Sequence, residues 1–407
     1  MDVFTVITVL FVISALISYL NVKVVRLPDA IGVVTISVVI SVIILVLGKS
    51  TATISAPVTE LVQNVNFSET VLNIFLGILL FAAALQFDYK KLKEERISVF
   101  ILSTLAVFVT TAVFGTLLFF ISKLIDFELP FVVCLLFGSI ISPTDPIVVE
   151  ALLKKTRLPE RLRILISGES LFNDGVGIIL FVVLLIISFN GGKPLPFSDI
   201  AGIFALEVIG GIAVGYVAGF FGSLLLKTTT DFKTVFLITT SVVLVLSEIA
   251  HAIHGSVPLA AVTAGLMIGN ANYRNPHLRL YLTRMWQFLD SIFNTLLFVL
   301  IGLQLVEMPF LANYWTIGLI SIILILIARF VSITLPAYVL LHKRNFANLF
   351  ILTWAGLRGA ISIALALLLP ESPYREVILS GCYMIVIFSI IVQGLTLNKV
   401  VEKLVGK

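Results

Sequence analysis

Charged side chains are scarce in this sequence. Only 12% of its 407 residues are Asp, Glu, Lys or Arg, about half the share that soluble globular proteins carry. Apolar residues make up 59%, and the mean hydropathy is +1.14. A soluble core cannot bury so large an apolar fraction, because burial is limited by the ratio of surface to volume. The composition therefore excludes a soluble enzyme, a nucleic-acid-binding protein and a disordered chain.

Cysteine and histidine are scarce as well. The two cysteines, Cys134 and Cys382, lie inside apolar runs and cannot form a disulfide framework. We interpret them as packing residues. Among the four histidines, His251 and His254 lie one turn apart, and we interpret them as surface groups and not as a zinc site. No basic stretch follows Met1, so the first apolar segment is predicted to be a membrane span and not a cleaved signal peptide.

Long apolar segments fill the rest of the chain. Each is long enough to cross the hydrocarbon layer of a bilayer, which is about 30 Å thick, although the ninth is short. In lipid such segments must be helices, because the backbone polar groups have no other partners. The sequence predicts an all-α polytopic membrane protein with about thirteen transmembrane helices, at residues 3–21, 31–48, 68–86, 97–122, 130–151, 162–188, 199–226, 233–251, 258–271, 283–304, 313–341, 346–369 and 376–398.

The basic residues between these spans alternate in number. Of the 27 Lys and Arg residues, 21 belong to the loops after the odd-numbered spans up to the eleventh and to the C-terminal tail. Four belong to the other loops, and two lie inside spans. Cytoplasmic loops carry an excess of positive charge. The pattern supports thirteen spans in a plasma-membrane protein with the N-terminus outside and the C-terminus in the cytoplasm, and it accounts for the net charge of +4 without a nucleic-acid partner.

Ionisable residues inside spans are candidates for function, because a charge at the centre of a bilayer costs several kcal/mol. Asp174 in span 6 and Arg358 in span 12 each lie roughly 18 Å from the start of their helix, near the midplane. Arg329 is either a gating residue or a neutralising partner of buried carboxylates, and the same alternatives hold for Arg358. The remaining intramembrane acidic residues are Asp145, Glu207, Glu248 and Asp290. We interpret Glu207 and Asp290 as satisfied pairs or funnel-edge charges and leave the role of Glu248 open.

Span 5 contains the sequence Gly-Ser-Ile-Ile-Ser-Pro-Thr-Asp-Pro at residues 138–146. Pro143 and Pro146 remove two amide donors and should unwind the helix. Unwinding frees carbonyl groups such as that of Thr144 beside the carboxylate of Asp145, and hard cations prefer this ligand set. The alternative is a simple proline kink.

Span 12 contains Trp-Ala-Gly-Leu-Arg-Gly-Ala at residues 354–360, and its glycines should loosen the helix around Arg358. Spans 5 and 12 are the fifth members of two groups of six spans with opposite orientation. Interrupted helices at matched positions of inverted repeats indicate a transporter with its site at the midplane. We predict repeat 1 at about 1–190, a linker helix at about 199–226 and repeat 2 at about 233–400.

Span 6 contains Ser-Gly-Glu-Ser-Leu-Phe-Asn-Asp-Gly at residues 167–175. Ser170 and Asp174 are four residues apart and share one helix face. Asn173 can form hydrogen bonds without carrying charge. Glu169 lies nearer the cytoplasm, and we expect it at the edge of an access funnel.

These motifs together resemble the monovalent cation:proton antiporters of the NhaP/NHE type, the cation:proton antiporter-1 family. The resemblance covers the whole membrane domain. It depends on Arg329 and on four short stretches, at residues 142–146, 168–175, 356–359 and 392–396.

The resemblance implies the NhaA-like fold, in which a dimerisation subdomain and a core subdomain are interleaved in the sequence and the two broken helices cross in the core. It implies a homodimer in membrane lipid that needs no cofactor. It also implies a role for each site residue: Asp174 would carry the proton and the cation, Thr144, Ser170 and Asp145 would complete the ion shell, and Asn173 would brace the site with an arginine.

The chain departs from the family pattern at Ala82, where many relatives have a glutamate that compensates the arginine. The sequence therefore leaves open how Arg329 and Arg358 are neutralised.

The function expected is exchange of a monovalent cation, Na⁺ or possibly Li⁺ or K⁺, for H⁺, with a role in pH homeostasis. Exchange would be electroneutral and one for one, by alternating access at a single Asp174 site. The alternatives are a K⁺-selective K⁺/H⁺ antiporter and a cation channel, which would conduct Na⁺ without moving protons. An intramembrane aspartyl protease is disfavoured, because neither Asp145 nor Asp174 has the Gly-x-Gly-Asp context.

Overall fold

The protein is built from helices. The computed structural model describes residues 3–48, 75–87, 89–125, 127–145, 149, 158–189, 196–271, 276–308, 314–340 and 346–405, and within these ranges it contains no strand. The elements are α1 (Val3–Leu20), η1 (Asn21–Val25), α2 (Asp29–Gly48), α5 (Leu76–Gln86), α6 (Tyr89–Glu94), α7 (Arg96–Leu124), α8 (Phe131–Ile141), α10 (Glu160–Phe189), α11 (Phe197–Ala205), η3 (Leu206–Gly210), α12 (Gly211–Leu226), α13 (Phe232–Ala252), α14 (Val257–Ala271), α15 (Pro276–Gln304), η5 (Leu305–Glu307), α16 (Trp315–Leu340), α17 (Phe346–Trp354), α18 (Ala360–Leu367), α19 (Arg375–Phe388), η7 (Ser389–Gln393) and α20 (Gly394–Val405).

Every predicted span coincides with at least one of these helices. Among the described residues, eight helices are long and apolar enough to cross a membrane, and four more are apolar but shorter. The shorter ones are α2, α5, α8 and α14, and α14 is the ninth span, for which the sequence already predicted a short helix. The first residues of span 3 and the last residues of span 5, including Pro146, lie outside the described residues.

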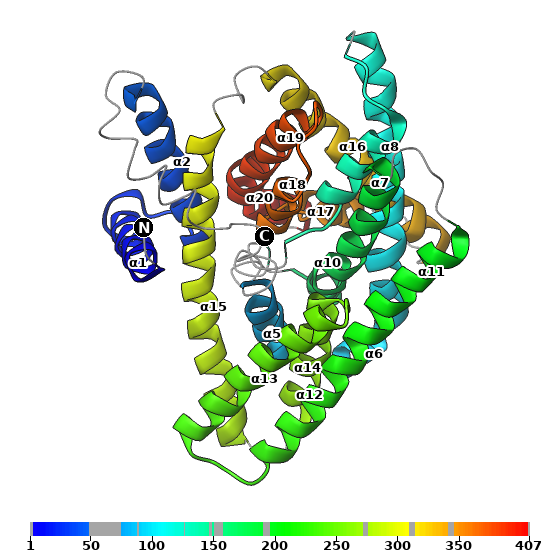
Figure 1. Cartoon of the computed structure of the whole chain (residues 1–407). Helices are drawn as coiled ribbons and strands as arrows, with labels where there is room; N and C mark the ends of the chain where they lie inside the picture. The colour runs from blue at the N-terminus through cyan, green and yellow to red at the C-terminus, as the bar shows by residue number, and fades with distance from the viewer. Residues whose placement is uncertain are drawn as a thin grey trace.

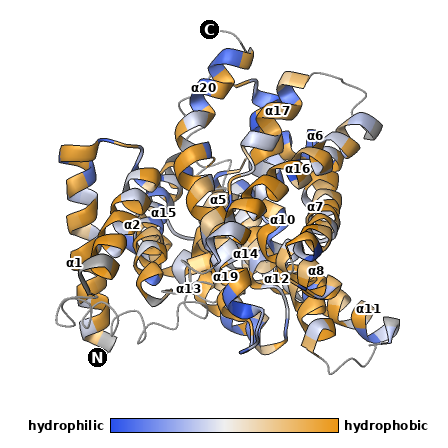
Figure 2. Cartoon of the chain, turned by 90° about the horizontal axis from the view of Figure 1, so that it is seen from above, coloured by the Kyte–Doolittle hydropathy of each residue, from blue (hydrophilic) through white to orange (hydrophobic). Residues whose placement is uncertain are grey.

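Hydrophobic residues follow one another along most helices, at the outside of the molecule as well as in its interior (Figure 2). Phe4, Phe100, Phe220 and Phe288 are each more than half exposed. In water such a surface would aggregate, because exposed apolar patches of this extent mark interaction or membrane surfaces. The chain is therefore a multi-pass membrane protein.

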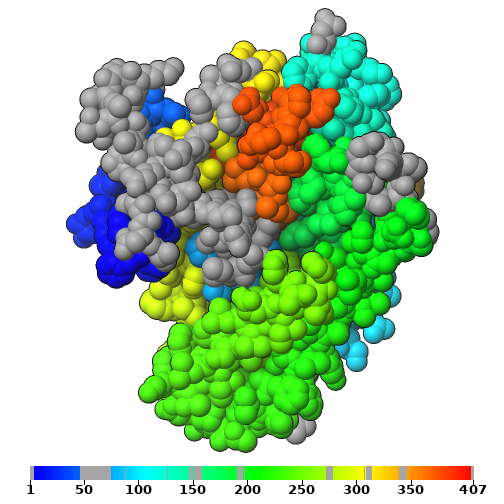
Figure 3. All heavy atoms as spheres, in the orientation of Figure 1, coloured from blue at the N-terminus to red at the C-terminus, as the bar shows by residue number. Residues whose placement is uncertain are grey.

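The helices pack into two groups that alternate along the chain (Figure 1). In one group α5 packs on α14, α14 on α12, and α12 on α13, while α1 and α2 pack on α15. In the other group α7 packs on α8, α10 and α16, and α19 packs on α16 and α18. The space-filling view shows the first group's α12 and α13 in green across the lower front face (Figure 3). Each group combines helices from both halves of the sequence.

Glycines allow the closest approach in the first group. A Cβ atom at Gly265 of α14 would lie 2.7 Å from the backbone oxygen of Phe81 in α5. Gly269, one turn later, faces the backbone oxygen of Leu85 in the same way. Small residues four apart let the backbones of membrane helices touch. Such van der Waals packing drives the association of helices in lipid, because lipid is as apolar as the helix surface and gives no hydrophobic driving force.

An N-cap begins α13. The carboxylate of Asp231 accepts hydrogen bonds from the hydroxyl group of Thr234 at 2.7 Å and from its backbone N–H at 2.9 Å. These bonds lower the pKa of Asp231, because they stabilise the ionised form. The cap marks the boundary between the 227–231 loop and the apolar helix.

Both predicted interruptions are present. Helix α8 ends at Ile141, and residues 142–145 are not helical. Helix α17 ends at Trp354, and α18 begins only at Ala360. Pro143 explains the first break, because it removes an amide donor and clashes with the preceding turn.

We predict that Gly265→Ala lowers stability although alanine is the better helix former. Its methyl group would meet the Phe81 backbone, and overpacking of this kind costs about 1–3 kcal/mol. The matched control is Gly202→Ala in α11, where an added Cβ has no atom within 4 Å; it should be neutral or up to about 1 kcal/mol stabilising. Thermal unfolding of the two purified variants in the same detergent checks the prediction, and equal melting temperatures would contradict it.

Candidate functional site

The two interrupted helices touch at their breaks. The backbone N–H of Asp145, in the non-helical segment after α8, donates a 2.7 Å hydrogen bond to the backbone oxygen of Leu357, in the segment between α17 and α18. Leu357 is fully buried and Asp145 is 7% exposed. Unwound backbone inside a membrane protein needs such internal partners, because lipid offers none.

Arg358 neutralises the end of α8. Its guanidinium group donates hydrogen bonds to the backbone oxygens of Ser142 and Pro143, the latter at 2.8 Å. The last carbonyls of a helix have no partner within it and carry partial negative charge. The buried cation of one broken helix therefore occupies the negative end of the other.

Asp145 makes the reciprocal contact. A Cβ atom at Gly359, the N-cap residue of α18, would collide with the carboxylate of Asp145, so this carboxylate lies directly against the start of α18. Helix N-termini carry partial positive charge and favour anions. Glycine at position 359 is required by this approach, because any side chain would fill the space of the carboxylate.

Arg329 of α16 is paired with Glu169 of α10. The two groups form a bidentate ion pair, with Nη2 of Arg329 2.9 Å from Oε2 of Glu169, and both residues are buried. The expectation that Glu169 edges an access funnel was wrong: its carboxylate is 1% exposed and holds a buried arginine. For Arg329 the pair answers the question raised by Ala82, since Glu169 supplies the compensating carboxylate.

A chain of hydrogen bonds joins α10 to the broken segment. The hydroxyl groups of Thr144 and Ser170 are 2.8 Å apart, and the side-chain amide of Asn173 donates to Thr144 Oγ1 at 2.7 Å. We expected Asn173 to bond an arginine, but its side-chain amide bonds Thr144, and its Oδ1 has no hydrogen-bond partner among the described residues. The structure thus brings Thr144, Ser170, Asn173 and Asp145 together around one point.

Asp174 lies at this point and differs from every other buried charge. It is fully buried, and neither carboxylate oxygen has a hydrogen-bond partner among the described residues. Asp145 is close enough for the two carboxylates to repel each other. A bound cation or a proton would relieve both the burial and the repulsion.

Sequence reasoning missed one supporting residue. The hydroxyl group of Ser389 in η7 accepts a 2.8 Å hydrogen bond from the backbone N–H of Arg358 and donates one of 2.7 Å to Gln393. Gln393 in turn bonds the backbone oxygen of Trp354. A π-helical turn often marks a functional site, and here it satisfies the freed backbone of the broken helix. No local pattern around Ser389 signals this role.

The other intramembrane candidates lie apart from this cluster. Asp290 accepts a 3.0 Å bond from Asn294 one turn away, as expected for a satisfied charge. Glu248 is exposed and Glu207 is half-buried. His251 near the end of α13 and His254 just after it are both exposed, and the two cysteines are buried and free, as predicted. Within the described residues, no group of three or more His, Cys, Asp or Glu residues could hold a metal ion.

Fold and site define a class: a polytopic helical membrane protein in which two interrupted helices meet beside buried carboxylates. The sequence matches the family model described as "sodium/hydrogen exchanger, transmembrane" over residues 11–403. The chain belongs to this sodium/hydrogen exchanger family of transporters.

Curated relatives align over nearly the whole chain. One is the Na⁺/H⁺ antiporter NhaP of Pseudomonas aeruginosa, 35% identical, with 96% of this chain and 95% of the relative covered. Another is the Na⁺/H⁺ antiporter NhaH of Halobacillus dabanensis, 29% identical, with 99% and 98% covered.

A solved structure has the same fold. The sodium proton antiporter MjNhaP1 of Methanocaldococcus jannaschii superposes with a TM-score of 0.78, at 21% identity, over the full length of both chains.

We predict that Glu169→Gln destabilises the protein strongly. It leaves the buried charge of Arg329 without its carboxylate, which costs about 3–5 kcal/mol. The matched control is Glu371→Gln, which breaks the exposed ion pair between Glu371 and Arg375 and should cost at most about 1 kcal/mol. Thermal unfolding in detergent measures both losses.

The double variant Glu169→Gln with Arg329→Met should recover part of the loss, because it removes both charges. Equal stability of Glu169→Gln and Glu371→Gln would contradict the assignment of the buried pair.

Proposed function

We propose that the chain is a secondary active transporter that exchanges Na⁺ for H⁺ across the plasma membrane by alternating access. The observation that carries the proposal is Asp174, a fully buried carboxylate without a hydrogen-bond partner among the described residues, at the contact of two interrupted helices. The names of the relatives, which are Na⁺/H⁺ antiporters, support the same reading.

The ligands for the cation are oxygen atoms. The carboxylates of Asp174 and Asp145 supply charge, and the hydroxyl groups of Thr144 and Ser170, 2.8 Å apart, supply neutral donors. Hard cations prefer such oxygen sets. Asn173 fixes the orientation of Thr144 through its 2.7 Å bond and does not titrate.

Coupling follows from the cost of a buried charge. When Asp174 holds a proton or a sodium ion, its charge is balanced, whereas the empty ionised form leaves an uncompensated carboxylate in the membrane. The site can then change from one side of the membrane to the other only when Asp174 holds a proton or a sodium ion. Sodium and protons are therefore exchanged, and neither crosses alone. One sodium ion replaces one proton at one carboxylate, and the exchange is electroneutral.

The two helix groups provide the moving parts. Helices α7, α8, α10 and α16 to α20 form the core subdomain that carries the site, and α1, α2, α5 and α12 to α15 form the dimerisation subdomain. Few contacts join the groups compared with those inside each group. The topology of thirteen spans in two inverted repeats, with the N-terminus outside, and the homodimer are part of the proposal.

We predict that Asp174→Asn abolishes exchange, because asparagine can neither carry the proton nor balance the cation. Proteoliposomes with a pH-sensitive dye inside should show no proton movement above background when sodium is added. The control is Asp199→Asn on exposed α11, which should exchange at the wild-type rate.

Retained exchange in Asp174→Asn would contradict the proposal. Sodium flux without proton movement in the wild-type protein would instead favour a channel. The same assay with lithium and potassium shows which of the three cations drives proton movement most strongly.

A further inference from the structure

A cavity of about 460 Å³ lies between the two helix groups, away from the ion site. Its walls come from α6, α7, α10, α14 and the continuous segment α11, η3 and α12. The volume is within the range of about 300–1,000 Å³ that small-molecule sites occupy. On α10 its lining residues are Phe172, Val176 and Ile179, which lie on the opposite side of the helix from Ser170 and Asp174.

The interior of the cavity offers almost only apolar atoms. Two of its hydroxyl groups are satisfied within their own helices: Ser103 donates to the Phe100 backbone oxygen at 3.2 Å, and Thr263 donates to that of Leu259 at 2.7 Å. Phe204, Val208 and Ile212, spaced four residues apart, form the wall from α11 to α12. A hydrocarbon chain fits such a lining, whereas a polar molecule would lose its hydrogen bonds to water.

Among the described residues, one charged side chain lines the cavity, at the start of α7. Arg96 is the first residue of α7, is exposed, and has no ion pair among the described residues. Its neighbours do have partners: Glu95 is paired with Arg161, and Lys91 is paired with Glu160. Arg96 therefore presents an uncompensated positive charge at the point where the apolar helix begins.

The cavity extends away from Arg96 in one direction. Glu95 meets Arg161, and Val99 lies against Gly168, so α7 and α10 run in parallel here. Ile179 is eleven residues beyond Gly168, which places the far end of the cavity roughly 20 Å from Arg96 at 1.5 Å per residue. The occupant is thus long, apolar along its length, and anionic at one end.

We propose that this cavity binds an anionic phospholipid, with one acyl chain between α10 and α12 and the phosphate headgroup on Arg96. Basic residues next to a membrane attract anionic lipid headgroups electrostatically. The apolar lining gives the acyl chain packing contacts, and the preference for an anionic lipid comes from the headgroup on Arg96, because surrounding lipid is as apolar as the lining.

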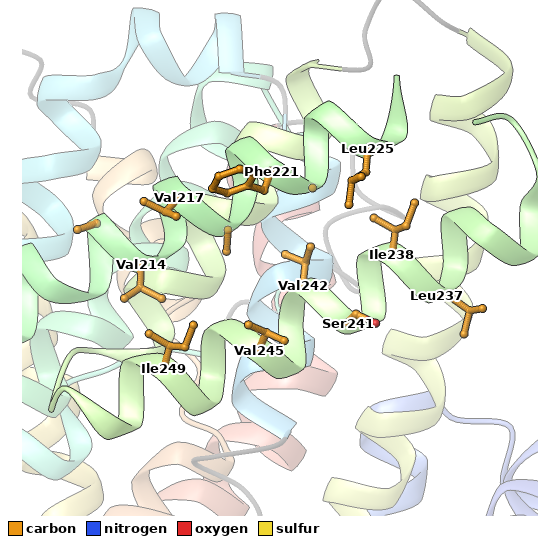
Figure 4. Close-up of a pocket in the computed structure, with 13 residues that line it drawn as sticks. Val214, Val217, Phe221, Leu225, Leu237, Ile238, Ser241, Val242, Val245 and Ile249 are labelled. Atoms are coloured by element: carbon orange, nitrogen blue, oxygen red, sulfur yellow. The ribbon is translucent and has the colours of Figure 1, made fainter. Parts of the chain in front are cut away.

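A second, larger cavity provides a matched comparison. It measures about 680 Å³, lies between α12 and α13, and is lined by apolar side chains together with Ser241 (Figure 4). No charged residue of the described part of the chain lines it. It should therefore not distinguish anionic from zwitterionic lipid.

The test is native mass spectrometry of the detergent-purified protein after incubation with equal amounts of palmitoyl-oleoyl phosphatidylglycerol and phosphatidylcholine. The wild-type chain should retain one phosphatidylglycerol in preference to phosphatidylcholine. Arg96→Gln should reduce this retention several-fold, whereas Lys93→Gln, which removes an exposed charge that does not line the cavity, should leave it unchanged.

Filling the cavity tests the acyl-chain site separately from the charge. Val176→Trp should lose the bound phosphatidylglycerol, and Val217→Trp, which fills the α12–α13 cavity, should keep it. Size-exclusion chromatography confirms that each variant is folded. Equal retention of the two lipids by the wild type, equal retention in Arg96→Gln and Lys93→Gln, or selective retention of added free oleate would overturn the proposal.

Discussion

The fold depends on how charge is balanced where two helices break inside the membrane. Each break exposes backbone groups that lipid cannot satisfy. In the structure each break satisfies the other. Arg358, from the break between α17 and α18, binds the carbonyl groups after α8, and Asp145, from the break after α8, lies against the start of α18. The bond between Asp145 N–H and the Leu357 oxygen joins the two segments directly. The glycine at 359 is a consequence of this arrangement, because it leaves room for the carboxylate.

Charge balance also distinguishes the residues that stabilise the site from the residue that is proposed to bind the transported ions. Arg329 and Glu169 neutralise each other, and Ser389 orients the backbone of Arg358. Asp174 alone among these buried charges lacks a hydrogen-bond partner in the described part of the chain. In the proposed mechanism this imbalance is the source of coupling, because a proton or a cation must supply what the protein does not.

The spans and the helix breaks could be predicted from the sequence, because a membrane limits the length and polarity of each segment by itself. Apolar length predicts spans, and Pro143 predicts the break after Ile141. The four-residue spacing of Ser170 and Asp174 predicts a shared helix face, and Ser170 on this face contacts Thr144. The pairing of Glu169 with Arg329 could not be predicted in this way, since the residues are 160 positions apart and the packing of both α10 and α16 on α7 brings them together. Ser389 was missed for the same reason. The interleaving of the two helix groups likewise depends on long-range packing, which hydropathy does not encode.

The central claim is that one carboxylate holds either a proton or a sodium ion. The most direct measurement is the number of protons released when sodium binds to the purified protein in detergent. A pH indicator in weakly buffered solution follows the release, at a pH at which Asp174 is protonated before sodium is added. The account predicts one proton released per sodium bound in the wild-type protein and none in Asp174→Asn. Sodium binding without proton release in the wild type would contradict it.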